Sequence, residues 1–309
     1  MSIPERTTAA FCGIVAYLGW GFVALYFGIL DDRGVEPLAL LAHRIVWSAA
    51  FCVLLLGLMG RAREIACIFC DPARWIPLGL SSILIAVNWI AFVYAVDQKR
   101  LTEASLGYYL LPLVSVLLGW LVLRERLSRV QSFCLLLAST GVGILIWEEG
   151  QIPWIGVTVA LSFGFYGLVR KLTPVGPIAG LAVETIFLVP LAGLYLGSGI
   201  TPKKYDILTY VLLVLAGAIT ASLLMLYAKA AQGLKLSTLG FMQYIAPTCQ
   251  LLVAMYLRPE QPEWMGFIPI WVALVIFSVH VAVRSRSSVR PVKIHDRPAD
   301  SSTVRAGDS

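Results

Sequence analysis

Long apolar runs separated by short polar segments occupy most of the chain. A helix needs roughly 20 consecutive apolar residues to cross a hydrocarbon core of about 30 Å. The runs here are continuous and rich in leucine, which favours helices over the alternating strands of an outer-membrane barrel. The pattern predicts an all-α integral membrane protein with ten transmembrane helices at residues 9–30, 38–59, 75–96, 103–123, 130–147, 152–169, 177–196, 207–228, 236–257 and 264–283.

Polar residues mark several boundaries between these runs. Residues 31–34 (Asp-Asp-Arg-Gly) close the first pair, Asp71-Pro72 precedes the third run, and residues 148–150 (Glu-Glu-Gly) separate the fifth from the sixth. The first run is too long for a cleaved signal peptide and lacks a small-residue cleavage site. Residues 284–309 are polar, so we predict a disordered cytoplasmic tail there.

Composition and charge leave little room for a soluble domain. Hydrophobic residues make up 59% of the chain, charged residues 14%, and the mean hydropathy is +0.81, whereas ordinary soluble domains are about 25% charged. With the N-terminus inside, cytoplasmic segments hold 17 of the 24 Lys and Arg residues, outer loops hold 6, and Arg44 lies within a span. The positive-inside rule then predicts that both termini face the cytoplasm. The net charge of +6 is therefore a topology signal and does not indicate a nucleic-acid partner.

The chain also contains an internal repeat. Residues 37–44 (PLALLAHR) align with residues 177–184 (PIAGLAVE), and the last position is Arg44 in one copy and Glu184 in the other. Each predicted repeat, 9–147 and 152–283, has five crossings, so the second must enter the membrane from the opposite side, as in inverted-repeat transporters. Further matches in the same order are Tyr94-Ala95 with Tyr227-Ala228, Leu106-Gly107 with Leu239-Gly240, Pro112 with Pro247, and Glu125 with Glu260.

Arg44 and Glu184 are the first candidates for a functional site. Each lies about seven residues inside its span, hence roughly 10 Å deep from opposite sides. In a core of about 30 Å their backbones differ in height by about 10 Å, so their side chains could meet directly or across a substrate or water. Arg44 would then anchor an anionic or polar substrate group, and Glu184 would be a counter-charge or proton carrier. In the alternative, Arg44 snorkels outward and Glu184 is neutral at a helix end.

Other polar residues within the spans allow two interpretations each. His43 points about 100° away from Arg44 and either titrates near neutrality or packs. A buried amide or phenol needs partners, so it either joins helices or contacts substrate. A proline within a helix removes a hydrogen bond and serves as a hinge or an inert kink. Candidates of the second kind are Asn88, Tyr108, Tyr109, Gln243 and Tyr244, and candidates of the third are Pro112 and Pro247.

Two carboxylates are expected at helix ends. Glu103 is expected near the mouth of a cavity, and Glu125 is expected in solvent beside Arg124 and Arg126.

Several longer strings resemble a known family. HRIVWS (43–48), NWIAFVYAV (88–96), EASLGYYLLPL (103–113), GFYGLVRK (164–171) and LSTLGFMQYIAPT (236–248) resemble the RarD group of the EamA family, in the drug/metabolite transporter superfamily. The resemblance covers roughly residues 9–283. It implies a bacterial inner-membrane carrier of ten helices in two EamA repeats, with a central cavity lined by the first four helices of each. The group is associated with chloramphenicol sensitivity.

These observations predict a secondary transporter, or permease, of small organic solutes. It would export drugs or metabolites by alternating access, with a proton as the simplest coupling ion. A non-transporting membrane sensor or scaffold with a carrier fold is the alternative. An enzyme is disfavoured because no serine has an obvious base, and no phosphate-binding glycine motif or metal-binding cluster predicts a cofactor. The predicted partners are a small-molecule substrate, lipid and protons, and the chain could act as a monomer or a homodimer.

Overall fold

The computed structural model describes residues 3–199, 204–257, 268–277 and 279, and these are helical apart from short connections. Eight of the helices are long and apolar enough to cross a membrane. The predicted all-helical membrane protein is thus confirmed for this part of the chain. The tail 284–309, the loop 258–263 and residues 264–267, 278 and 280–283 of the predicted tenth span lie outside the described residues. The helices are α1 (Ile3–Asp32), α2 (Pro37–Leu58), α3 (Arg63–Phe69), α4 (Pro72–Asp97), α5 (Leu101–Leu121), α6 (Arg129–Glu149), α7 (Trp154–Leu172), α8 (Pro177–Gly197), α9 (Ile207–Gly233), α10 (Leu236–Gln243) and α11 (Ile245–Leu257), followed by a helical segment, Ile268–Phe277.

Two elements differ from the sequence prediction. The short helix α3 was not expected, because its seven residues are too few to give a recognisable apolar period. The ninth span is two helices instead of one, with α10 ending at Gln243 and α11 beginning at Ile245. Pro247 has no N–H for the carbonyl of Gln243, which favours a break at this point. Pro112, with which the sequence comparison above aligns Pro247, lies inside the continuous helix α5.

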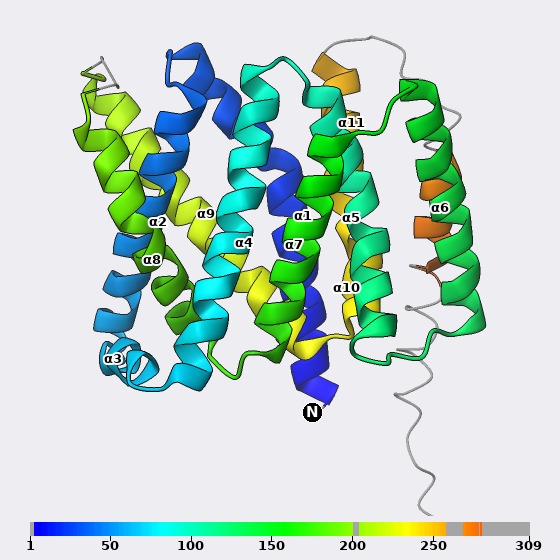
Figure 1. The fold of residues 1–309 in the computed structure, drawn as a ribbon, viewed down its shortest axis with the longest axis horizontal. Coiled ribbons are helices and arrows are strands. Elements are labelled where there is room, and N and C mark those ends of the chain that lie inside the picture. The colour runs from blue at the N-terminus through cyan, green and yellow to red at the C-terminus, as the bar shows by residue number, and fades with distance from the viewer. Residues whose placement is uncertain (1–2, 200–203, 258–267, 278, 280–309) are drawn as a thin grey trace, which may run out of the picture.

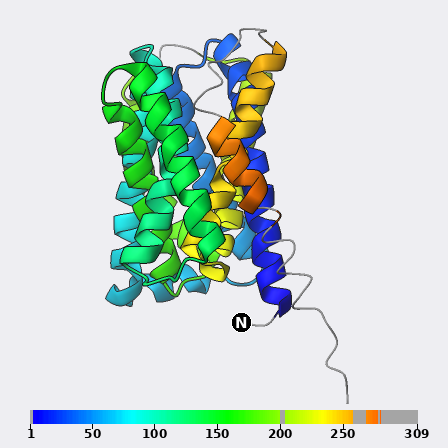
Figure 2. The same cartoon turned by 90° about the vertical axis from the view of Figure 1, so that its right-hand side faces the viewer.

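The spanning helices stand roughly parallel, and the chain passes back and forth between two faces (Figure 1). We call the end that holds the start of α1, the helix α3 and the α5–α6, α7–α8 and α9–α10 connections the lower face. The opposite end, with the α1–α2, α4–α5 and α6–α7 connections, is the upper face. In Figure 1, α6 and the segment Ile268–Phe277 lie at the right-hand edge of the bundle, which is the side that faces the viewer in Figure 2. They pack there on α5 and α10, where the rings of Phe241 and Phe277 are 4.4 Å apart.

Helices from the two halves of the chain interleave. Extensive contacts join α1 to α9, α4 to α7, α2 to α8, α2 to α9, α4 to α8, α5 to α7, α1 to α11 and α5 to α10. These contacts are symmetric between the halves. If α1 is exchanged with α7, α2 with α8, α4 with α9, and α5 with the α10–α11 pair, the same set of contacts results. The first four spanning helices of each half therefore occupy corresponding environments.

Glycines allow the closest approaches between the halves. A Cβ atom on Gly156 of α7 would lie 2.4 Å from the carbonyl oxygen of Glu103 in α5. A Cβ atom on Gly217 of α9 would lie 2.3 Å from the Cβ atom of Trp47 in α2. Small residues at such crossings are typical of membrane helices, which associate by close packing because lipid is as apolar as their side chains.

Glu125 joins the α5–α6 connection to the start of α10. Its carboxylate accepts hydrogen bonds from the backbone N–H groups of Leu236 (2.7 Å) and Ser237 (2.9 Å), and from the Ser237 hydroxyl (2.7 Å). A negative charge is favourable at the N-terminus of a helix, where backbone N–H groups have no partner within the helix. The expectation that Glu125 is simply solvated was therefore wrong, because its partners lie more than 100 residues away in the sequence.

Replacing Glu125 with alanine should lower the free energy of unfolding by about 2 kcal/mol, since the variant loses a helix cap and a charged acceptor. Unfolding of the purified protein in mild detergent would measure this loss. Glu64→Ala is the matched control, because Glu64 forms an exposed pair with Arg61 and its removal should change stability little. Equal stability of the two variants would contradict the capping role.

Candidate functional site

Arg44 projects from α2 among helices of both halves. Its Nε donates a hydrogen bond to the Thr220 hydroxyl of α9 at 3.0 Å. Its guanidinium lies 4.6 Å from the ring centroid of Phe27 in α1 and 5.2 Å from that of Trp89 in α4. Such cation–π contacts orient a guanidinium without neutralising it. None of the ion pairs among the described residues includes Arg44, so this half-buried cation has neutral neighbours only.

Tyr108 is another polar residue near Arg44. It lies on α5 within electrostatic range of the guanidinium, and its ring packs 6.1 Å from that of Phe92. His43 points elsewhere, as the helical rotation predicts, and its ring lies 6.3 Å from that of Tyr210 in α9. Arg44, Tyr108 and Thr220 are therefore the polar residues that converge here, and we call them the Arg44 site.

Asn88 is buried between α4 and α7. Its side-chain amide donates to the carbonyl of Val159 at 2.9 Å and to the hydroxyl of Ser162 at 3.3 Å. These contacts join two helices that come from different halves of the chain. They match the structural role considered for Asn88, because they use both N–H groups of the amide within the protein.

Glu184 is fully enclosed, with 1% of its side chain exposed. One carboxylate oxygen accepts a hydrogen bond from the Ser81 hydroxyl at 2.5 Å and lies 3.4 Å from Nε of Arg170. The other accepts from the Tyr166 hydroxyl at 3.2 Å. Glu184 thus connects α8 to α4 and α7, and its cation is Arg170. We call Glu184 and Arg170 the buried ion pair.

Arg170 was missed in the sequence because it follows the predicted span 152–169 and reads as a loop charge beside Lys171. In the structure it belongs to the last turn of α7 and is 0% exposed. Gly180 makes room for it, since a Cβ atom there would lie 2.3 Å from Nη1 of Arg170. The repeat alignment contained this signal, because Gly180 stands where the first copy has Leu40.

Direct contact between Arg44 and Glu184, one of the two arrangements considered above, does not occur. Glu184 lies within electrostatic range of Cys52, which follows Arg44 by eight positions on α2. Eight residues correspond to about 12 Å along a helix. Arg44 is thus nearer the upper face and the buried ion pair nearer the lower face.

An aromatic cluster fills the space between these two sites. It consists of Tyr17, Trp20, Phe163, Tyr166 and Tyr227, whose ring centroids lie 5.0 to 6.2 Å from their neighbours. Trp20 precedes Phe27 on α1 by seven positions, and Tyr227 follows Thr220 on α9 by seven. Both are therefore about 10 Å closer to the lower face than the residues that touch Arg44. At its lower edge the cluster reaches Glu184 through Tyr166.

Several buried polar atoms among the described residues of this bundle lack hydrogen-bond partners. The hydroxyls of Tyr227 and Tyr244 and both terminal nitrogens of Arg170 are buried without a hydrogen bond in the described part of the chain. Gln243 accepts from the Ser115 hydroxyl at 2.9 Å, and Tyr109 donates to the carbonyl of Pro247 at 3.4 Å. Buried polar groups are normally hydrogen-bonded, so these unpaired atoms are exceptions within the bundle.

Comparison with known proteins identifies the family. The model of the EamA-like transporter family matches residues 7–147. The uncharacterized transporter PA0485 of Pseudomonas aeruginosa is 40% identical over 277 residues, which cover 86% of this chain and 91% of that protein. The chain belongs to the EamA-like transporter family. It is therefore a multi-pass membrane transporter and not an enzyme.

Two proteins named RarD are also similar to this chain. Protein RarD of Salmonella typhimurium is 38% identical over 90% of this chain and 96% of that protein. The chloramphenicol-sensitive protein RarD of Pseudomonas aeruginosa is 30% identical over 82% of this chain and 89% of that protein. A crystal structure with 18% sequence identity covers 90% of this chain and 98% of its own, with a TM-score of 0.65, and so shares the fold. Within the EamA-like match lie Arg44, Asn88 and Tyr108, whereas the buried ion pair lies in the second half.

Proposed function

We propose that this transporter is a secondary carrier that exports small organic solutes by alternating access, and that residues 9–147 and 152–283 form inverted repeats. The observation that carries the proposal is the placement of Arg44 and Glu184 on corresponding helices, α2 and α8, on opposite sides of an aromatic cluster. The exchange symmetry of the helix contacts supports it, because such symmetry gives a protein two related arrangements.

The Arg44 site is the proposed substrate anchor. A cation among neutral neighbours gains most from a ligand that brings a carboxylate or another strong acceptor. Phe27 and Trp89 would flank the bound group, and the Tyr108 and Thr220 hydroxyls would add hydrogen bonds. A small organic solute with an acidic or strongly polar group is the class that this arrangement fits.

The buried ion pair is the proposed lock on the lower side. While Arg170 and Glu184 are paired, they hold α7, α8 and α4 together below the aromatic cluster. A proton on Glu184 would remove its charge and weaken its attraction to Arg170, so that these helices could separate. A proton can shift the conformational balance only because it binds one arrangement better than the other. Pro247, beside the break between α10 and α11, and Pro112 would serve as hinges.

In the proposed orientation the lower face lies in the cytoplasm. The membrane is proposed to be a bacterial inner membrane. Arg170 is buried and no longer counts as a loop charge, which changes the cytoplasmic count of Lys and Arg from 17 to 16, against 6 outside. This bias still favours both termini inside. Cysteines introduced at Lys235 (lower face) and Lys99 (upper face) should be labelled by an impermeant thiol reagent from opposite sides of the membrane. Labelling of both from one side would contradict the inverted arrangement.

Transport itself is tested in two steps. Metabolites would be compared between cells that lack the protein and cells that overproduce it. Compounds that accumulate in the cells without the protein would be tested as substrates, together with chloramphenicol. Purified protein in liposomes should then move such a compound, and an imposed pH gradient should accelerate the movement. Empty liposomes are the control. Binding without movement would instead favour the non-transporting sensor.

A further inference from the structure

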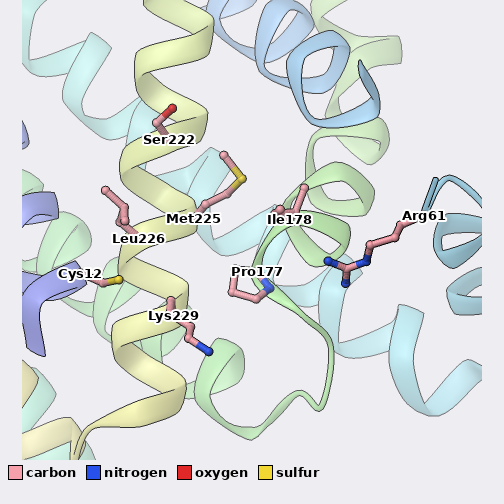
Figure 3. A pocket seen from close by; sticks show the side chains of 8 residues that line it. All are labelled: Cys12, Arg61, Pro177, Ile178, Ser222, Met225, Leu226 and Lys229. Atoms are coloured by element: carbon pink, nitrogen blue, oxygen red, sulfur yellow. The ribbon is translucent and has the colours of Figure 1, made fainter. Parts of the chain in front are cut away.

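A cavity of about 420 Å³ lies toward the lower face, away from the Arg44 site (Figure 3). Helices of both halves surround it. Its lining consists of Cys12 of α1, Arg61 after α2, Pro177 and Ile178 at the start of α8, and Ser222, Met225, Leu226 and Lys229 of α9.

The cavity begins beyond the close crossing of α2 and α9. At this crossing the Ser48 hydroxyl donates to the carbonyl of Gly217 at 2.8 Å, and no space remains for a larger side chain at Gly217. Further along α9, the residues at 222, 225, 226 and 229 follow helical spacing and form one continuous wall. Met225 and Ile178 extend toward each other from the two walls in Figure 3.

Two cations face this space from opposite sides. Figure 3 shows the side chain of Arg61 directed toward the start of α8, whereas the side chain of Lys229 extends from α9 and ends below Pro177 in this view. Arg61 also pairs with Glu64, with Nε at 2.5 Å and Nη2 at 3.0 Å from its carboxylate oxygens. Lys229 belongs to none of the ion pairs among residues 3–199 and 204–257. No acidic residue lines the cavity, so the positive charge of Lys229 has no negative partner among the lining residues.

The remaining lining is apolar apart from Ser222, whose hydroxyl donates to the carbonyl of Ala218 in its own helix at 2.8 Å. An apolar wall with a cation at its rim suits a molecule that has a hydrocarbon part and an anionic group. The volume lies within the range of about 300–1,000 Å³ that is usual for small-molecule sites.

We propose that this cavity is a second binding site, which takes an amphiphilic anion with its carboxylate or phosphate beside Lys229 and Arg61 and its apolar part on Met225, Leu226 and Ile178. The headgroup of an anionic lipid and a free organic acid share this chemistry. The site shares no residue with the Arg44 site or the buried ion pair, so its binding can be tested separately from transport. A bound anion would connect α9 to the turn after α2 at the lower face.

Binding to the purified full-length protein in neutral detergent tests the proposal. The two probes are didecanoyl phosphatidylglycerol, compared with didecanoyl phosphatidylcholine of equal tails, and 1-naphthoate, compared with neutral 1-naphthalenemethanol. We expect at least one anionic probe to bind better than its matched control. Binding of the lipid alone assigns a lipid site, and binding of 1-naphthoate assigns a site for organic acids.

Variants decide whether this cavity is responsible. Lys229→Gln should weaken binding of the anionic probe by about tenfold, the value of one charge-assisted hydrogen bond. Lys204→Gln, which changes an exposed lysine at the upper face, should leave it unchanged. Met225→Trp should also weaken binding, because the larger side chain fills the cavity. Equal binding by the Lys229→Gln and Lys204→Gln proteins would overturn the proposal, as would failure of both anions to bind the unmodified protein.

Discussion

Replacing Arg170 with methionine should destabilise the protein by about 3–5 kcal/mol, which is the usual cost of removing one member of a buried ion pair. The side chains of Arg170 and Glu184 are 0% and 1% exposed, so water cannot solvate the carboxylate that remains. The hydrogen bonds from Ser81 and Tyr166 would still reach Glu184, but both donors are neutral. The variant therefore keeps a buried charge without its counter-charge.

A double variant separates this explanation from simple loss of packing. Arg170→Met combined with Glu184→Gln removes both charges. The glutamine oxygen can accept the hydrogen bond of one of the two hydroxyls, Ser81 or Tyr166, and its NH2 group can donate to the other. Replacing both members of a buried pair is often close to neutral, so the double variant should recover most of the lost stability. Thermal or denaturant unfolding in mild detergent would measure all four proteins of the cycle.

Arg33→Gln is the matched control, because Arg33 forms an ion pair with Asp206 in which the side chains are 34% and 61% exposed. Exposed pairs contribute little to stability, so this change should have a small effect. If the losses from Arg170→Met and Glu184→Gln simply add in the double variant, the two groups do not act as a pair.

The same four proteins also test whether Glu184 carries the coupled proton. Glu184→Gln alone leaves Arg170 as a buried, unpaired cation, so a fall in its transport would mix instability with loss of a proton site. The double variant contains neither charge and should be the more stable protein. If Glu184 carries the proton, the double variant should move substrate at a rate that no longer depends on the pH gradient. A gradient dependence equal to that of the unmodified protein would exclude Glu184 as the carrier.

Local sequence signals predicted the spanning helices well because each depends on the residues within one run. The same signals failed where a residue's role depends on a distant partner. Arg170 follows an apolar run and precedes Lys171, a context in which basic side chains usually reach the membrane surface. Gly180, on the next helix, leaves the space that Arg170 occupies inside the bundle, and this contact is not visible in the sequence around Arg170.

Glu125 shows the same limit. It lies between two arginines, which suggests solvent, yet its carboxylate binds the start of α10.

For the candidate site residues, too, the sequence indicated their places along the helices but not their partners. The sequence placed Arg44, Asn88 and Glu184 within apolar runs, but it left open whether Arg44 reaches outward to the membrane surface and whether Glu184 is neutral at a helix end. It could not assign their partners, since helix packing brings those from other parts of the chain.

Replacing Arg44 with alanine should reduce substrate transport by about 10- to 100-fold, the loss expected when a hydrogen-bonded charge contact to a ligand is removed. In contrast to Arg170→Met, this change should leave the free energy of unfolding nearly unchanged. Arg44 is half-buried with neutral neighbours, so its removal leaves no opposite charge behind. A half-buried cation within a membrane-spanning helix that lacks a counter-charge is unfavourable, and membrane proteins usually keep such residues for function.

Transport in liposomes and unfolding in detergent would be measured on the same protein preparations. Arg44→Lys should retain part of the activity, because lysine keeps the charge but cannot make the bidentate and stacked contacts of a guanidinium. Arg33→Ala, an arginine in the connection at the upper face, should transport normally. Full transport by Arg44→Ala would show that Arg44 does not bind substrate. Loss of both stability and transport would instead make Arg44 a structural residue. Arg170 already has an anionic partner in the protein, so its removal should lower stability. Arg44 has no such partner, so its removal should lower transport alone.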